Sequence, residues 1–254
     1  MRIVVLGGTG AVGRHVVDAA TAGGHTVVVA TRTGTAPIGS TAARADASSG
    51  EGLTAAFAGA DLVIDTTNVT ARRTKATPQL FTTMAERVSA AAAQAGVQRV
   101  VLLSIVGIDA FADGYYRGKS AQEQAYRAGA TPVTILRSTQ FHEFVGQILT
   151  SLPFVPVRVV PRMRIQPVAA RDVAAALVEA AEGPAVERVP DLAGPQVREL
   201  ADLAKALLKA GKSPAAVFSL RLPGQSGRLM SDGALLATSG RRSSLSFDDW
   251  LVQQ

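Results

Sequence analysis

Cysteine is absent from this sequence, which also holds only three histidines and one tryptophan in 254 residues. Without cysteine there is no disulfide scaffold, thiolate zinc site, iron–sulfur cluster or cysteine nucleophile. The histidines are His15, His25 and His142, too few for a histidine-rich metal site. We therefore predict no bound metal.

Long apolar runs are also missing. No stretch of about 18 apolar residues is free of charges and helix breakers, which is the length that a membrane-spanning helix needs. The apolar run at residues 3–6 is shorter than the core of a secretory signal and leads directly into a glycine cluster. The sequence therefore predicts a cytoplasmic protein without a membrane span.

The charge balance is basic, with 26 Lys and Arg against 20 Asp and Glu, a net charge of +6 and a pI near 10.2. Nucleic-acid binding is a weak interpretation, because no basic helix carries base-reading side chains and Trp250 stands beside Asp248 and Asp249. Cations without acids gather in residues 69–85 and 158–171. These stretches are either solvated loops or a rim that attracts an anionic or phenolic small molecule. We expect a small-molecule partner, aromatic or anionic, and neither nucleic acid nor membrane.

Short β-branched runs alternate with helical patterns through the first 140 residues. The strands are nearly continuous in Val, Ile and Leu, which is typical of a parallel sheet covered on both faces. This alternation indicates right-handed βαβ units, so we predict an α/β fold with a doubly wound parallel sheet. The predicted strands are 3–6, 26–30, 61–66, 99–104 and 132–136, and the predicted helices are 13–22, 52–58, 78–95 and 118–127.

A glycine-rich loop joins the first predicted strand to the first helix. Gly7 allows a tight turn, Gly10 lets the backbone approach a pyrophosphate, and Gly13 lets helix and strand pack closely. The helix N-terminus adds unpaired N–H groups and the positive end of its dipole. In this strand–helix context, dinucleotide binding is favoured over a purely structural turn. The predicted contacts of the loop are Gly7, Thr9, Gly10, Ala11, Val12 and Gly13.

The texture of the chain changes after Phe141, where proline becomes frequent and helices at 171–182 and 198–210 alternate with short extended pieces. We predict that residues 1–152 form an NAD(P)-binding Rossmann core and that residues 153–254 form a smaller substrate-binding lobe. The two are expected to pack as one structural unit, in a monomer or a homodimer.

The end of the second strand distinguishes the two nicotinamide cofactors. An acidic residue there would bond the ribose 2′-hydroxyl of NAD, but this chain has Arg32. A guanidinium binds phosphate through two parallel hydrogen bonds, and Arg14 follows the last glycine of the loop. We predict NADP(H) in preference to NAD(H), with Arg32 on the 2′-phosphate; the alternative is a solvated surface arginine. Asp46, where a third strand would end, is expected to accept from the adenine amino group.

Motifs spread along the whole chain carry a family resemblance: the glycine loop, Gly24–Val27, Arg32, Asp65–Asn68, Val101–Gly107, Tyr115–Glu123, Ile135–Phe141, Arg171–Ala174 and Phe247–Leu251. The sequence resembles the atypical short-chain dehydrogenases/reductases, and among them the NmrA-like NAD(P)H-binding group. The resemblance implies that Thr66, Thr67 and Asn68 line the nicotinamide ribose.

Ser104, Tyr115 and Lys119 are spaced like the catalytic triad of the short-chain dehydrogenases. Reduction of a carbonyl needs a proton donor at the developing alkoxide, and a tyrosine beside an ammonium can serve. At i and i+4 of a helix, Tyr115 and Lys119 would share one face. Lys119 would also bond the nicotinamide ribose, and Ser104 would hold the substrate oxygen. Tyr116 and His142 are alternative donors, and the spacing also arises by chance.

The predicted function is that of an NADPH-dependent oxidoreductase acting on a carbonyl, a quinone or a related small molecule. The alternatives are a non-catalytic NADP(H)-sensing regulatory protein, and an epimerase or dehydratase with recycled cofactor. His142 is either a substrate-side acid or a packing side chain. The predicted substrate-side residues are Phe141, His142, Phe144 and Met163.

Overall fold

The computed structural model describes residues 1–37, 39–69, 77–150 and 157–254. The chain forms two compact units, each gathered from separate segments. The predicted boundary at residues 152 and 153 lies outside the described residues. The first unit comprises Met1–Ser104, Asp113–Arg137 and Val173–Val189, and the second comprises Ile105–Ala112, Ser138–Asp172 and Pro190–Gln254.

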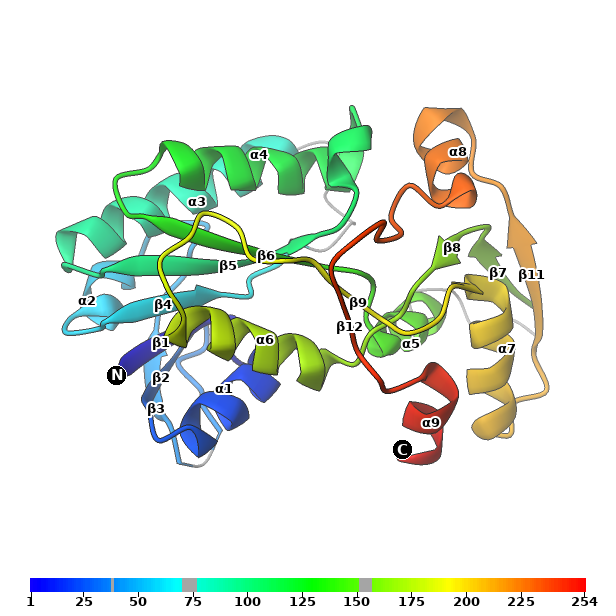
Figure 1. Cartoon of the computed structure of the whole chain (residues 1–254), viewed down its shortest axis with the longest axis horizontal. Coiled ribbons are helices and arrows are strands. Elements are labelled where there is room, and N and C mark those ends of the chain that lie inside the picture. Colours follow the sequence, from blue (N-terminus) through cyan, green and yellow to red (C-terminus); the bar gives the residue numbers. More distant parts are fainter. Residues whose placement is uncertain (38, 70–76, 151–156) are drawn as a thin grey trace. The chain divides into compact units, whose positions relative to one another are not determined.

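The first unit is built on a parallel sheet whose strands follow the spatial order β6-β5-β4-β1-β2-β3 (Figure 1). Strand β1 pairs in parallel with both β2 and β4, and β4 pairs in parallel with β5. The α/β fold with a doubly wound parallel sheet is confirmed. The strands are β1 Arg2–Leu6, β2 Thr26–Thr31, β3 Thr41–Arg44, β4 Leu62–Asp65, β5 Arg99–Ile105 and β6 Val133–Ser138.

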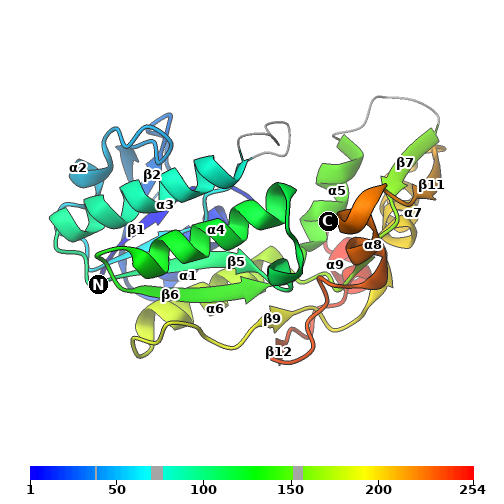
Figure 2. The same cartoon turned by 90° about the horizontal axis from the view of Figure 1, so that it is seen from above.

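Helices cover both faces of this sheet, with α3 and α4 on one face and α1 and α6 on the other (Figures 1 and 2). Helix α4 starts four residues before the predicted start at residue 118. Gly114, with φ +66°, stands at this start. The helices are α1 Gly13–Ala22, α2 Leu53–Phe57, α3 Thr77–Gln94, α4 Gly114–Ala128 and α6 Ala170–Glu182, of which residues 173–182 belong to the first unit.

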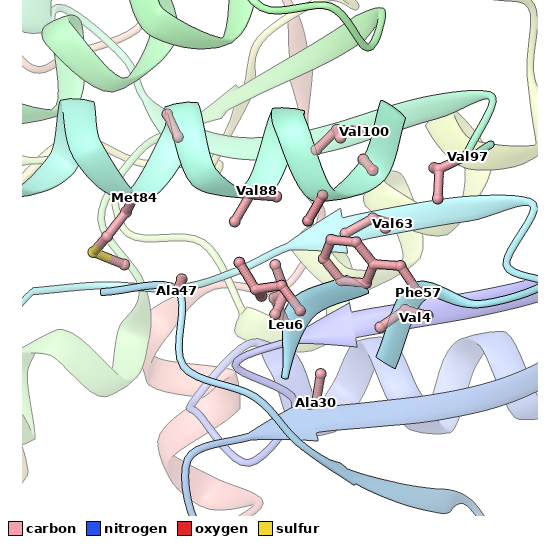
Figure 3. Close-up of a cluster of buried hydrophobic side chains, with 14 of the residues drawn as sticks. Val4, Leu6, Ala30, Ala47, Phe57, Val63, Met84, Val88, Val97 and Val100 are labelled. Carbon is pink, nitrogen blue, oxygen red and sulfur yellow. The ribbon is translucent and has the colours of Figure 1, made fainter. Parts of the chain in front are cut away.

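One cluster of buried hydrophobic side chains lies between the sheet and helices α2 and α3 (Figure 3). Val4 and Leu6 point to this face because side chains two apart on a strand share a face. They join Phe57 and Val88, which are fully buried. Ile3 and Val5, on the opposite face, are equally buried. Burial on both faces explains the continuous apolar strand sequences, and each such side chain contributes about 1.5–3 kcal/mol.

The second unit contains several short strands. Strands β7 and β11 pair in parallel, β8 and β10 pair antiparallel, and β9 and β12 pair in parallel. Among the described residues, no helix is long and apolar enough to span a membrane. The elements of the second unit are the 3₁₀ helix Ile108–Ala110, α5 His142–Thr150, β7 Val157–Pro161, β8 Arg164–Ile165, β9 Leu192–Ala193, β10 Arg198–Glu199, α7 Leu200–Ala210, β11 Ala216–Leu220, α8 Gly224–Asp232, β12 Arg241–Arg242 and α9 Phe247–Val252.

Candidate functional site: the carboxyl edge of the first unit

The strand order reverses at β1, because β2 and β3 lie on one side of it and β4, β5 and β6 on the other. Such a reversal opens a crevice beyond the carboxyl ends of the two central strands, where doubly wound sheets bind ligands. Here the segments after β1 and β4 touch, since Thr66 donates to the carbonyl oxygen of Leu6 from both its N–H (3.1 Å) and its hydroxyl (2.8 Å). The two loops at this edge are therefore held together.

The glycine loop is shaped for close backbone approach. Gly7 has φ +75°, and the N–H of Gly10 donates to its carbonyl oxygen at 2.8 Å. A Cβ on Gly13 would lie 2.1 Å from the same carbonyl oxygen, so only glycine fits. Helix α1 then begins at Gly13 with no side-chain cap from Val12. Its first N–H groups therefore have no capping side chain, which fits the pyrophosphate of a dinucleotide.

The other loop residues predicted to contact the cofactor differ in exposure. Thr9 and Arg14 are exposed, Ala11 is half-buried and Val12 is buried. The Arg14 guanidinium donates to Nε2 of His15 at 3.4 Å, a long contact. Arg14 thus lies in the first turn of α1, beside the site predicted for the phosphates.

Arg32 and Asp46 are brought together at the end of β2. Arg32 follows the last residue of β2 and is exposed. Burial alone would raise the pKa of Asp46, but hydrogen bonds from Ser48 and the nearby charge of Arg32 hold that pKa below its usual range. Oδ1 of Asp46 accepts from the N–H and the hydroxyl of Ser48 at 2.8 and 2.7 Å. The predicted 2′-phosphate ligand therefore has a carboxylate beside it.

Asp65, the last residue of β4, was not singled out by the sequence analysis as a site residue. Its Oδ1 accepts from the N–H (2.8 Å) and the hydroxyl (2.6 Å) of Thr67. Its Oδ2 accepts from the hydroxyl of Tyr126 (2.6 Å) and from Nε2 of Gln122 (3.4 Å). The signal in the sequence was a carboxylate that closes an apolar strand two residues before a threonine, which is typical of an Asx turn.

Tyr115 occupies the first turn of α4 and points its phenol at the segment after β4. The hydroxyl donates to Oδ1 of Asn68 at 2.9 Å. The ring packs edge-to-face on Phe81 of α3, with centroids 5.9 Å apart, and on Tyr116, at 5.4 Å. Burial raises the pKa of Tyr115 to about 12, so the phenol is protonated at neutral pH.

Lys119 lies one turn further along the same face of α4. Its ammonium donates to the carbonyl oxygen of Leu103 at 2.9 Å and to Oε1 of Gln122 at 2.6 Å, and it lies 5.4 Å from the ring centroid of Phe81. Burial lowers the pKa of Lys119 to about 8, although the charges of Asp65 and Glu123 oppose that shift. Tyr115 and Lys119 thus share Phe81 as a neighbour, but each hydrogen-bonds a different partner.

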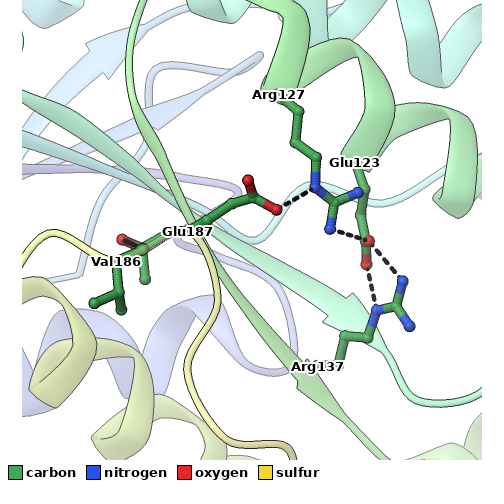
Figure 4. Close-up of polar contacts among 6 residues, drawn as sticks. Glu123, Arg127, Arg137, Val186 and Glu187 are labelled. Atoms are coloured by element: carbon green, nitrogen blue, oxygen red, sulfur yellow. Dashed lines mark hydrogen bonds and ion pairs between the residues drawn. The ribbon is translucent and has the colours of Figure 1, made fainter.

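Ser104 is buried beside Glu123. That carboxylate is the centre of an ion-pair cluster with Arg127 and Arg137 (Figure 4). The Ser104 hydroxyl has no regular hydrogen-bond partner among the described residues, yet it lies close enough to Glu123 to lower the pKa of that carboxyl. Glu123 accepts from Nε and Nη2 of Arg137, both at 2.7 Å, and from Arg127 at 3.2 Å. Burial alone would raise the pKa of Glu123, but the two guanidinium groups keep it below its usual range. The third predicted triad member therefore stands beside a buried carboxylate.

The predicted substrate-side residues lie in the second unit, and within it His142 has an aromatic environment. His142 is fully buried, with its ring 5.6 Å from that of Phe247 and 5.4 Å from that of Trp250. Its Nε2 lies 3.3 Å from the carbonyl oxygen of Leu245. This environment favours the packing interpretation. Met163 is buried, and Phe141 and Phe144 are half-buried.

Only part of the two predicted basic stretches falls within the described residues. Arg72, Arg73 and Lys75 of the first basic stretch lie outside the described residues. Arg158 and Arg162 of the second stretch belong to β7 and the residue that follows it. Within the described ranges, no three His, Asp or Glu side chains gather in a way that would hold a metal ion.

Comparisons with solved structures show the same fold over the whole chain. The NADPH-dependent quinone oxidoreductase QOR2 of Escherichia coli, complexed with NADPH, is 20% identical with a TM-score of 0.73, covering 99% of both chains. The triphenylmethane reductase of Citrobacter sp., complexed with NADP(H), is 17% identical with a TM-score of 0.73, covering 100% of this chain and 99% of that one. A nucleoside-diphosphate-sugar epimerase of Staphylococcus aureus is 16% identical with a TM-score of 0.73, covering 99% of both.

Curated proteins give no match to the sequence. A protein-family model described as NAD(P)H-binding matches residues 7–184, which include the glycine loop, the end of β4 and helix α4. The resemblance to the atypical short-chain dehydrogenases/reductases is thereby confirmed. The chain belongs to the NAD(P)H-binding family.

Proposed function

We propose that the protein is an NADPH-dependent oxidoreductase that reduces a carbonyl, a quinone or a related small molecule. The observation that carries the proposal is the phenol of Tyr115, protonated at neutral pH and held by Asn68 at the end of β4. Strand β4 is the neighbour of β1, which leads into the glycine loop. The phenol proposed as proton donor thus belongs to the carboxyl edge of the sheet, where doubly wound sheets bind dinucleotides.

The chemistry follows from the state of the phenol. When bound, a reduced nicotinamide supplies a hydride to the carbonyl carbon. Tyr115 gives its hydroxyl proton to the carbonyl oxygen, and the resulting phenolate regains a proton from solvent. With a pKa of about 12 the phenol is still far more acidic than an alcohol product, so the transfer is favourable. Lys119 places positive charge on the same face of α4, and the role proposed for Ser104, from its spacing, is to hold the substrate oxygen.

The alternative is an epimerase or a dehydratase with recycled cofactor, which would use the same residues. Sugar epimerases are among the structural neighbours and share this fold.

The proposed cofactor is NADPH. Arg32 follows β2 on the side of β1 opposite β4, where the adenosine half would lie, and its guanidinium fits a 2′-phosphate. Two structural neighbours were solved with NADPH or NADP(H), and they act on a quinone and a triphenylmethane. An aromatic or anionic acceptor is therefore the proposed substrate class.

The test is to mix the purified protein with NADPH and a panel of quinones, ketones and enones while following the loss of reduced nicotinamide absorbance. We expect turnover with at least one acceptor and a decrease of about 10²- to 10⁴-fold in kcat for Tyr115→Phe. Tyr116→Phe is the matched control, since it removes the neighbouring hydroxyl. Full turnover of Tyr115→Phe would exclude this phenol as donor. Tight NADPH binding without turnover of any acceptor would instead indicate a non-catalytic NADP(H)-sensing regulatory protein.

A further inference from the structure

One face of α4 carries four polar residues, and three of them hydrogen-bond the end of β4 or the segment that follows it. Tyr115, Lys119, Gln122 and Tyr126 are spaced by four, three and four positions, which places them in a single stripe. Tyr126 and Gln122 hydrogen-bond Asp65, and Tyr115 hydrogen-bonds the side chain three residues later. The helix therefore contacts the β4 terminus at two points.

The two oxygens of the Asp65 carboxylate accept hydrogen bonds from different parts of the chain. Oδ2 accepts from α4, through Tyr126 and Gln122. Oδ1 accepts from the backbone and the side chain of Thr67, in its own turn. The side chain is 1% exposed, and its four donors supply the hydrogen bonds that a buried carboxylate requires. Binding α4 alone would need only one of the two oxygens.

The turn that Asp65 holds lies on the nicotinamide side of the crevice. Arg32 stands beyond β2 on one side of β1, and β4 lies on the other side. A dinucleotide with its pyrophosphate at the glycine loop and its adenosine toward Arg32 extends its other half toward β4. That direction leads to Thr67 and Asn68.

We propose that Asp65 is a positioning residue for the nicotinamide half of the cofactor. Its carboxylate anchors the turn at Thr67 to helix α4, so that Asn68 and the phenol of Tyr115 keep a fixed place beside the nicotinamide ribose. The inference rests on the proposed function and its cofactor orientation. It deepens that function by adding the residue that keeps Asn68 and the Tyr115 phenol in position.

The experiment compares two ligands by titration: NADPH and 2′-phospho-ADP-ribose, which lacks the nicotinamide. In Asp65→Asn we expect the Kd for NADPH to rise about 10- to 100-fold, the loss of a hydrogen bond to a charged group. The Kd for 2′-phospho-ADP-ribose should stay within about twofold of the wild type, since a change of that size is below the worth of a typical hydrogen bond. Equal weakening of both ligands would mean a merely structural role and overturn the proposal.

Two further variants keep the test decisive. Thr67→Val removes only the hydroxyl donor to Oδ1, and it should also raise the Kd for NADPH and not that for 2′-phospho-ADP-ribose. The double variant Asp65→Asn/Thr67→Val should bind NADPH no more weakly than Asp65→Asn. Additive effects contradict the inference. A Thr67→Val protein that binds NADPH like the wild type contradicts it even if Asp65→Asn does not fold. Ser89→Ala, which removes a buried hydrogen bond to Thr131 elsewhere in the first unit, controls for general loosening. A wild type that binds NADPH but reduces nothing would remove the proposed function and leave this inference intact.

Discussion

The ammonium of Lys119 donates a 2.9 Å hydrogen bond to the carbonyl oxygen of Leu103, while the phenol of Tyr115, one turn earlier, is bonded to Asn68. The lysine therefore lies against β5 in the core of the first unit, and the tyrosine against the segment that follows β4. The spacing pairs the two residues on one helix face, and the structure gives each a separate partner. A buried ammonium of this kind has consequences for stability as well as for catalysis.

Stability should rise with pH in the alkaline range because of Lys119. Its pKa is about 8 in the folded protein and about 10.4 in the unfolded chain, so the unfolded state binds more protons between those values. The contribution of Lys119 to the free energy of unfolding should then increase across this window by on the order of 3 kcal/mol, while the tyrosines, whose pKa values are raised in the folded protein, lower stability at its alkaline end. Denaturant titrations from about pH 7 to about pH 10.5 measure it. Lys119→Met should remove this increase, and parallel curves for both proteins would exclude Lys119 as the source.

The cofactor preference should depend on Arg32 and on the acid beside it. Arg32→Ala should raise the Kd for NADPH about 10- to 100-fold, the loss of a charge-assisted contact, and leave the Kd for NADH unchanged. Asp46→Asn should strengthen NADPH binding, because it removes a negative charge near the predicted phosphate position. Arg228→Ala, in the second unit, controls for the change of net charge. Equal losses for NADPH and NADH in Arg32→Ala would place that guanidinium away from the 2′-phosphate.

The buried ion pair between Glu123 and Arg137 should contribute far more to the free energy of unfolding than the exposed pair between Arg127 and Glu187 (Figure 4). Glu123→Gln leaves the buried guanidinium without its counter-charge and should lower the free energy of unfolding by about 3–5 kcal/mol. Glu187→Gln breaks the contact between Arg127 and a carboxylate whose side chain is 67% exposed, and should cost about 0–1 kcal/mol. Chemical denaturation gives both values. Similar losses in the two variants would contradict the assigned difference.

Gly13→Ala should damage the glycine loop directly. The new Cβ would lie 2.1 Å from the carbonyl oxygen of Gly7, so the backbone must shift where the phosphates are expected. We expect a loss of about 1–3 kcal/mol in stability and at least about tenfold weaker NADPH binding. Gly146→Ala is the control, since its Cβ meets Leu207 at an ordinary 3.7 Å. Unchanged NADPH affinity in Gly13→Ala would separate the loop from cofactor binding.

His142 should affect the stability of the protein and not its kcat. Burial lowers its pKa below the ordinary value of about 6.5, so the unfolded chain binds the proton first as pH falls. Stability therefore decreases below about pH 6.5, and His142→Phe should reduce that acid loss while keeping kcat near the wild-type value. Thermal unfolding at several pH values and a turnover assay check both parts. A folded His142→Phe protein without activity would make this histidine the proton donor.

Local patterns account for most of what could be predicted. Strand β1, the glycine loop and α1 follow from contiguous residues, because apolar runs and glycine spacing encode backbone conformation directly. The start of α4 was missed, since the stretch from Gly114 to Arg117 lacks an apolar period and only Gly114 marks it. The cluster around Glu123 was missed as well, because its guanidinium partner Arg137 comes from the next strand.

The sequence by itself determined the α/β class and the glycine loop, since each depends on residues close together along the chain, and the family, through short motifs spread along it. The tertiary structure decided which partners the buried polar groups take. Lys119 meets a carbonyl 16 positions away, and Tyr126 meets Asp65 from 61 positions away. Those contacts exist only once α4 packs against the sheet and burial makes each unpaired polar group costly. That physical requirement gives the Asp65 carboxylate its donors from α4, Tyr126 and Gln122.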